Sequence, residues 1–209
     1  MEIAELIADL VAAHRGGPAP LVLVGDPVLR REAQPVAGQI DSALLRELAD
    51  IMFATMRAAP GVGVAAPQIG IPLRMAVLGD PATGLDPEVA AARKRRPLPE
   101  FTILDPSYTA DGAPVGFYEG CLSMPGFQAV VRRPESIVAS YTDLDGARHT
   151  ERLTGWPARI FQHETDHLAG TIYIDRALTR SITTNAALQE RWAQPTPAAA
   201  AEALGFDPA

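Results

Sequence analysis

The chain of 209 residues has little cysteine and no long apolar run, and each shortage excludes a class of protein. Cys121 is the only cysteine, so no disulfide can form within the chain, which suits a reducing cytosol. No run approaches about 18 apolar residues, the length of a membrane-spanning helix. The net charge of −7 argues against broad nucleic-acid binding. Because the first residues are acidic where an export signal is basic, we expect a cytoplasmic protein without membrane or specific nucleic-acid partners.

One local run of basic residues extends from Arg93 to Arg96. This stretch lies within residues 79–100, where several prolines and a glycine predict an exposed loop. A solvated loop is the favoured interpretation, because runs of like charge usually face water. Contact with RNA is the alternative, and the sequence assigns the loop no function.

The apolar spacing predicts one domain that contains both helices and short strands. Hydrophobic residues make up 47% of the chain, which is ordinary for a globular protein. Helices are expected over residues 2–14, from Ser42 to Pro60-Gly61, from Pro157 to Gly170 and over residues 184–192; strands over residues 73–78, 101–104, 128–133, 136–142 and 147–153, with a turn at Asp145-Gly146. The fold class is therefore α+β. The Pro- and Ala-rich tail is expected to form a short helical turn or to be disordered, and it is given no function.

Three short stretches contain most of the residues that could perform chemistry. They are residues 61–68 (GVGVAAPQ), 119–123 (EGCLS) and 162–167 (QHETDH). In the third, His163 and His167 are four residues apart and share one face of a helix, with Glu164 beside the first. Two imidazoles and the thiolate of Cys121 make three metal ligands and leave a coordination position open, which is typical of a catalytic site.

Other readings of these residues remain open at this point. The histidines could be a structural pair, Cys121 a small buried apolar residue, and Gln68 a turn residue. A zinc metalloprotease is the rival enzyme, but the position where one such class has its third histidine holds Tyr173, and the nearest downstream glutamate is Glu190. A structural metal module would need a fourth protein ligand, and the chain has no second cysteine.

Together the three motifs resemble those of the peptide deformylases of bacterial type, over residues of about 20 to 180. The resemblance implies one domain in which antiparallel sheets pack around a central helix that carries the H-E-x-x-H ligands. It implies a catalytic domain over residues 1–180, with residues 1–19 as a helical extension and 181–209 as a C-terminal helix and tail. The implied activity is metal-dependent removal of the N-formyl group from formylmethionine of new polypeptides, which releases formate.

The resemblance also implies a cofactor, partners and catalytic roles. The ion held by Cys121, His163 and His167 would be Fe²⁺, for which Ni²⁺, Co²⁺ or Zn²⁺ can substitute. Glu164 would be the general base and then the general acid, while Gln68 and the backbone N–H of Leu122 would stabilise the oxyanion. The substrates would be N-formylmethionyl nascent chains, met by a monomer in transient contact with the ribosome. The alternative is a specialised paralogue that confers inhibitor resistance or acts on other formylated substrates.

Substrate contacts follow from the same resemblance. The peptide would bind as an added strand, and the methionine side chain would enter an apolar pocket. The residues expected to contact it are Val62, Gly63, Phe117, Glu119, Gly120, Trp156 and Ile160. Some family members have an arginine seven residues after the cysteine, where this chain has Gln128. The neighbouring Arg132-Arg133 pair is a candidate to supply that charge instead.

Overall fold

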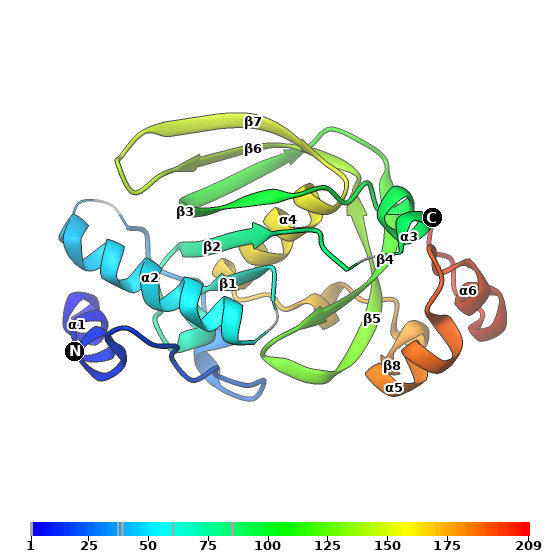
Figure 1. The fold of residues 1–209 in the computed structure, drawn as a ribbon, viewed down its shortest axis with the longest axis horizontal. Helices are drawn as coiled ribbons and strands as arrows, with labels where there is room; N and C mark the ends of the chain where they lie inside the picture. Colours follow the sequence, from blue (N-terminus) through cyan, green and yellow to red (C-terminus); the bar gives the residue numbers. More distant parts are fainter. Residues whose placement is uncertain (1, 37, 39, 60, 85) are drawn as a thin grey trace.

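The computed structural model of the protein describes residues 2–36, 38, 40–59, 61–84 and 86–209. Two helices, α1 (Ile3–His14) and α2 (Ser42–Ala58), pack together at one end, and α6 (Ala198–Leu204) lies at the other (Figure 1). Within the described ranges, no helix is both long and apolar enough to cross a membrane.

Two antiparallel sheets lie between these ends. The larger has the strand order β1-β2-β3-β6-β7, and the smaller has the order β4-β5-β8. The strands are β1 (Gly63–Ala65), β2 (Met75–Asp80), β3 (Leu98–Ala110), β4 (Pro114–Cys121), β5 (Met124–Pro134), β6 (Ser136–Thr142), β7 (Arg148–Thr154) and β8 (Thr183–Thr184). The β6–β7 hairpin turns at the predicted Asp145-Gly146 pair, with Gly146 at φ 82°.

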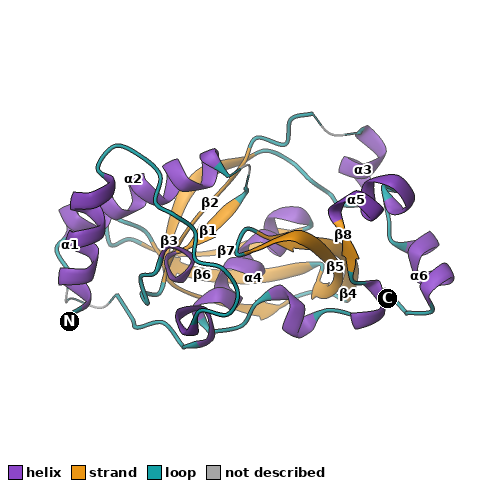
Figure 2. Cartoon of the chain, turned by 90° about the horizontal axis from the view of Figure 1, so that it is seen from below, coloured by secondary structure: helices purple, strands orange, loops and turns teal. Residues whose placement is uncertain are grey.

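Helix α4 (Trp156–Leu168) contacts strands of both sheets and lies between them (Figures 1 and 2). Pro157 occupies its first turn, where the missing N–H costs nothing, and Gly170 follows its end at φ 70°. Ile160, Phe161 and Leu168 pack into a core with side chains of β2, β3, β6 and β7. This core fixes the helix on which His163, Glu164 and His167 are placed.

A second core forms between α1, α2 and the other face of β1 and β2. It contains Ile7 and Leu48, which are fully buried, and Val64 and Val77. The Asp41 side chain caps α2 by accepting a hydrogen bond from the Ala43 N–H. Pro60, predicted to end α2 with Gly61, lies outside the described residues.

The prediction of one α+β domain with antiparallel sheets is confirmed. The prediction of a continuous loop over residues 79–100 is wrong. Strand β2 runs to Asp80, β3 begins at Leu98, and α3 (Pro87–Ala92) lies between them. Asp86 caps α3 by accepting hydrogen bonds from the N–H groups of Glu88 and Val89. Pro87 therefore begins a helix in this segment, where its missing N–H costs nothing.

The remaining elements are short: one precedes the first motif, one lies at its end, and the others connect α4 to the tail. They are η1 (Pro27–Arg30), η2 (Ala66–Ile69), η3 (Tyr173–Arg176), η4 (Thr179–Ser181), α5 (Asn185–Ala187) and the π-helical η5 (Leu188–Trp192). The helix expected over residues 184–192 is thus present as α5 and η5. The tail is not disordered, because α6 buries Ala200 against Tyr118 and Val130. Arg132 Nε also donates to the Asp207 carbonyl at 3.0 Å.

Candidate metal centre and active site

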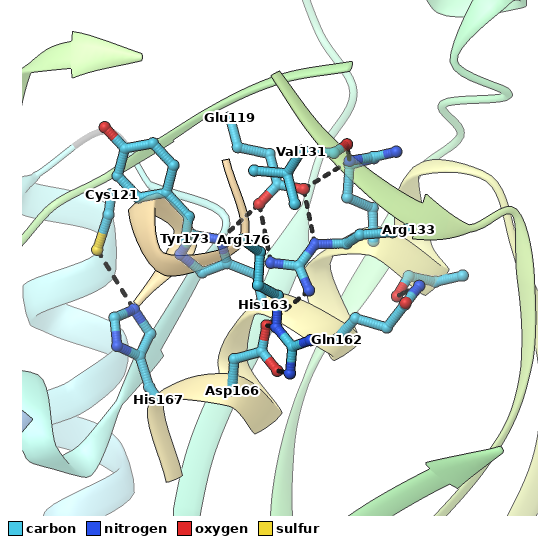
Figure 3. A network of polar contacts seen from close by, with 12 residues as sticks. Glu119, Cys121, Val131, Arg133, Gln162, His163, Asp166, His167, Tyr173 and Arg176 are labelled. Carbon is cyan, nitrogen blue, oxygen red and sulfur yellow. Dashed lines mark hydrogen bonds and ion pairs between the residues drawn. The ribbon is translucent and has the colours of Figure 1, made fainter. Parts of the chain in front are cut away.

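Cys121, His163 and His167 come together although the cysteine and the first histidine are 42 positions apart in the sequence. One ligand atom from each lies within 4.8 Å of the others. Sγ of Cys121 and Nε2 of His167 are 3.3 Å apart (Figure 3). A ligand group of this size and composition matches a small divalent ion, which binds sulfur at about 2.3 Å and imidazole nitrogen at about 2.0–2.1 Å.

The position of Cys121 results from an irregularity in the small sheet. Strand β4 pairs regularly with β5 as far as Gly120, and the register then shifts before Cys121, which pairs with Met124. A bulge of this kind redirects the side chain that follows it. The thiol is thereby placed against the histidines of α4, which supply the other two ligand atoms.

Glu119 orients His163 from the side opposite the ligand group. Its Oε2 lies 3.0 Å from His163 Nδ1, so Nε2 is the nitrogen left for a metal (Figure 3). Arg133 donates to both Glu119 oxygens, at 2.7 and 3.0 Å, and Arg159 donates to Oε1 at 2.6 Å. Burial alone would raise the pKa of Glu119, but Arg133, His163 and Arg159 outweigh it and hold that pKa well below its usual range.

The sequence did not indicate that arginines hold Glu119 in this network, although it gave Arg133 a different role. Arg133 is 2% exposed and also donates to Asp166 of α4 at 2.7 Å, so it ties β4, β5 and α4 together. The Arg132-Arg133 pair is therefore not a source of charge for the substrate, because Arg132 bonds the tail and neither residue lines the cavity. One signal was available for Arg159, which is four residues before His163 on the same helical face.

Glu164 is buried and incompletely paired. Its Oε2 has no hydrogen-bond partner among the described residues, and burial raises its pKa to about 7. Gly63 of β1 leaves the space that this carboxylate occupies: a Cβ at position 63 would lie 2.4 Å from Oε1 and 2.6 Å from Cδ of Glu164. The first and third motifs are therefore in direct contact at this residue pair.

Gln68 is fixed beside the thiol. Its Oε1 accepts a hydrogen bond from the Ala65 N–H at 2.9 Å, which determines the direction of the side-chain amide. Nε2 then faces the centre, 3.5 Å from Cys121 Sγ and 3.2 Å from Ser123 Oγ. A buried amide donor held in this way can stabilise negative charge that develops next to the ligand group.

A cavity of about 700 Å³ opens onto these groups. The predicted residues that line it are Val62, Gly63, Gln68, Glu119, Gly120, Cys121, Leu122, Trp156, Ile160, His163 and Glu164. Phe117 does not line it and borders a separate small cavity, with Arg93 and Arg159 bordering both. Tyr118, Arg93, Arg95 and Arg159 also line the main cavity and were not predicted to do so.

Comparisons with known proteins agree with this geometry. A family model, polypeptide deformylase, matches residues 18–182. Peptide deformylase 3 of Streptomyces avermitilis is 51% identical over 98% of this chain and 90% of the relative, and peptide deformylase 1 of Streptomyces coelicolor is 52% identical over 98% and 93%. A Met-Ala-Ser-bound class I type b peptide deformylase from Acinetobacter baumannii superposes with a TM-score of 0.67, at 33% identity over 76% of this chain and 97% of that one.

The fold and these relatives define the class: the protein is a metallohydrolase. The chain belongs to the polypeptide deformylase family, which removes the N-formyl group from nascent polypeptides. The prediction of deformylase activity is confirmed, and no relative supports the specialised alternative.

Proposed function

We propose that Cys121, His163 and His167 hold one ferrous ion, and that this site hydrolyses the formamide of N-formylmethionyl chains. The observation that supports this most directly is the convergence of three ligand atoms within 4.8 Å beside the buried Glu164, whose Oε2 has no hydrogen-bond partner in the described part of the chain. A thiolate among the ligands softens the site relative to one built from three histidines, and the family resemblance favours iron. Ni²⁺, Co²⁺ or Zn²⁺ would occupy the same ligands.

When bound, such an ion lowers the pKa of water towards neutrality and polarises a carbonyl oxygen. Glu164 then takes up the proton of the attacking water and later delivers it to the leaving amine. Its raised pKa of about 7 and its place in the cavity wall suit a group that must both accept and release a proton near neutral pH. Because Gly63 has no side chain, it leaves the space that the Glu164 carboxylate occupies.

Gln68 and Leu122 are proposed to hold the oxyanion. Nε2 of Gln68 is directed towards the centre, and Leu122 follows Cys121 directly, so its backbone N–H is the family's second donor. Losing one fixed donor of this kind typically lowers the rate by about 100- to 1,000-fold. Glu119 acts on the reaction through His163, which it orients, and does not bind the metal.

The peptide is proposed to bind as an added strand along Val62, Gly63 and Gly120, with the methionine side chain against Trp156 and Ile160. All five residues line the cavity, which supports this placement. Phe117 takes no part, because it lies on the far side of Arg93 and Arg159. Close walls around the centre admit a formyl group and exclude an acetyl group by size.

The wider setting is proposed on the same grounds. The protein acts in the cytoplasm as a monomer, in transient contact with the ribosome. Residues 1–180 form the catalytic domain, with 1–19 as an extension and 181–209 as an appendage; the family match to residues 18–182 supports this division.

The test compares three substrates with the metal-loaded enzyme. Formate release from formyl-Met-Ala-Ser, much slower release of acetate from acetyl-Met-Ala-Ser, and no cleavage within an unformylated protein are the expected results. A metalloprotease would show the reverse, with fragments from the protein and no formate, and this outcome would overturn the proposal.

A further inference from the structure

Two side chains of the basic stretch Arg93 to Arg96 line the active-site cavity. They are Arg93 and Arg95, whose guanidinium carbons lie 4.9 and 5.6 Å from the centroid of the Trp156 ring. Lys94 instead pairs with Glu135 at 2.7 Å. Arg93 and Arg95 are therefore part of the site, and the prediction that they lie in a solvated loop is wrong.

The backbone of this stretch is fixed against the start of α4. The Trp156 N–H donates to the Arg93 carbonyl at 3.0 Å. Gly155 permits this contact: its φ of 68° suits glycine, and a Cβ there would lie 2.9 Å from the same carbonyl oxygen. The pair between Lys94 and Glu135 of the β5–β6 connection anchors the next residue. Arg93 is thus held in place before any substrate arrives.

The three guanidinium groups of the cavity wall differ in how their charge is neutralised. Arg95 donates to both oxygens of Asp80, at 2.7 and 3.0 Å, and Arg159 donates to Glu119. Arg93 has no carboxylate partner in the described part of the chain, and its Nε is buried without a hydrogen bond. Burial, with Arg95 and Arg159 nearby, lowers the pKa of Arg93 to about 10, so it remains charged at pH 7.

Gln128, which stands where some family members have an arginine, is neutral. Gln128 lines the cavity and donates through Nε2 to Oδ1 of Asn185, which also lines it, at 3.2 Å. Neither amide carries charge, so Arg93 supplies the unneutralised positive charge among these lining residues. Its guanidinium lies over the rings of Trp156 and Phe117, at 4.9 and 5.8 Å from their centroids, and it lines the cavity, where a planar carboxylate is the group that pairs best with it.

We infer that Arg93 binds the carboxylate of an aspartate or glutamate at the second or third position of the formylated chain. Trp156 precedes His163 by seven residues, about 10 Å along the helix axis. An extended peptide advances about 3.3 Å per residue, so its second and third residues span a distance of this size, and Arg93 lines the same cavity as Val62, Gly63 and Gly120. The inference rests on the proposed deformylase function and names a preferred class of its substrates.

The test measures kcat/KM for formate release from C-terminally amidated peptides, so that no terminal carboxylate competes. Formyl-Met-Asp-Ser-amide is compared with formyl-Met-Asn-Ser-amide, and formyl-Met-Ala-Asp-amide with formyl-Met-Ala-Asn-amide. The wild type should prefer aspartate at one of the two positions by about tenfold, the effect of a hydrogen bond to a charged group. The ratio should fall to near one in Arg93→Gln and partly persist in Arg93→Lys. It should be unchanged in Arg96→Gln, an exposed neighbour that does not line the cavity.

The possible failures are distinguishable. Formate release with an aspartate-to-asparagine ratio of one at both positions in the wild type overturns the inference and leaves the proposed function intact. The inference is also overturned if the Arg93→Gln variant is folded, as judged by circular dichroism, and keeps the full aspartate-to-asparagine ratio. If Arg93→Gln does not fold, the wild-type ratio and its decline with added salt, which an ion pair requires, decide the matter. No formate from any peptide overturns the proposed function together with this inference.

Discussion

Replacing Gly63 by alanine tests whether the first motif serves to hold the general base. The new methyl group would lie 2.4 to 2.8 Å from Oε1, Cδ and Cγ of Glu164. Because carbon atoms pack at about 3.5–4.0 Å, the carboxylate must retreat by about 1 Å. Position 63 lies in strand β1, where alanine meets no backbone barrier, so the collision with Glu164 is the main perturbation.

The expected loss is large for so small a change. A misplacement of about 1 Å in a catalytic group can lower the rate about 100-fold, and general acid–base assistance is worth about 100- to 10,000-fold in all. We therefore expect Gly63→Ala to lower kcat about 100-fold. Metal content should be unchanged, because Cys121, His163 and His167 are not displaced by the new methyl group.

The assay is formate release from formyl-Met-Ala-Ser in a double-mutant cycle with Glu164→Ala. In the Glu164→Ala background, Gly63→Ala should cost no more than about threefold, because the group it displaces is gone. Gly120→Ala, which adds a methyl group to the same cavity but meets Gln128 at 3.2 Å, is the control for crowding of the peptide and should act mainly on KM. Additive losses in the double variant would refute the reasoning.

Two further predictions concern the buried charges. Glu164→Gln should keep the metal and lose about 100- to 10,000-fold in kcat, since it removes the base but not the ligands; activity within threefold of wild type would mean that another group moves the proton. Arg133→Met should lower the free energy of unfolding by about 3–5 kcal/mol, because Glu119 and Asp166 lose a buried partner. The free energy of unfolding is measured by urea unfolding with a chelator present. The control is Arg132→Met, whose ion pair is exposed and which should lower the free energy of unfolding by about 1 kcal/mol or less. Equal losses would contradict this account.

The features that follow local rules were predicted correctly. Residues 157–168 repeat apolar side chains at helical spacing, and Pro157 and Gly170 bound them, so α4 and the shared face of His163 and His167 could be read from the sequence. The β6–β7 hairpin was equally accessible, because Asp-Gly between alternating segments determines its own turn. The resemblance to deformylases, which the comparisons confirm, then indicated that the three motifs belong to one site.

The features that depend on long-range packing were missed. The sequence did not predict strand β4, and the resemblance placed Phe117 in the substrate pocket. Only the tertiary structure shows that Phe117 contacts Arg93 and Arg159 and borders a separate cavity. The burial of Arg133 depends on carboxylates 14 residues before it and 33 residues after it. The basic run from Arg93 to Arg96 was predicted to be solvated because its tertiary contacts are not visible in the sequence. In the structure, the Trp156 N–H donates to the Arg93 carbonyl and Arg93 lines the cavity.

The most direct test of the central claim is an anaerobic titration of the metal-free protein with Fe²⁺, with bound metal and the initial rate of formate release measured on the same samples. The account predicts that activity rises in proportion to bound iron and reaches a plateau at one ion per chain. His167→Ala should neither bind the ion tightly nor gain activity. Full activity in the metal-free protein, or a plateau reached by His167→Ala at the same stoichiometry, would contradict the account.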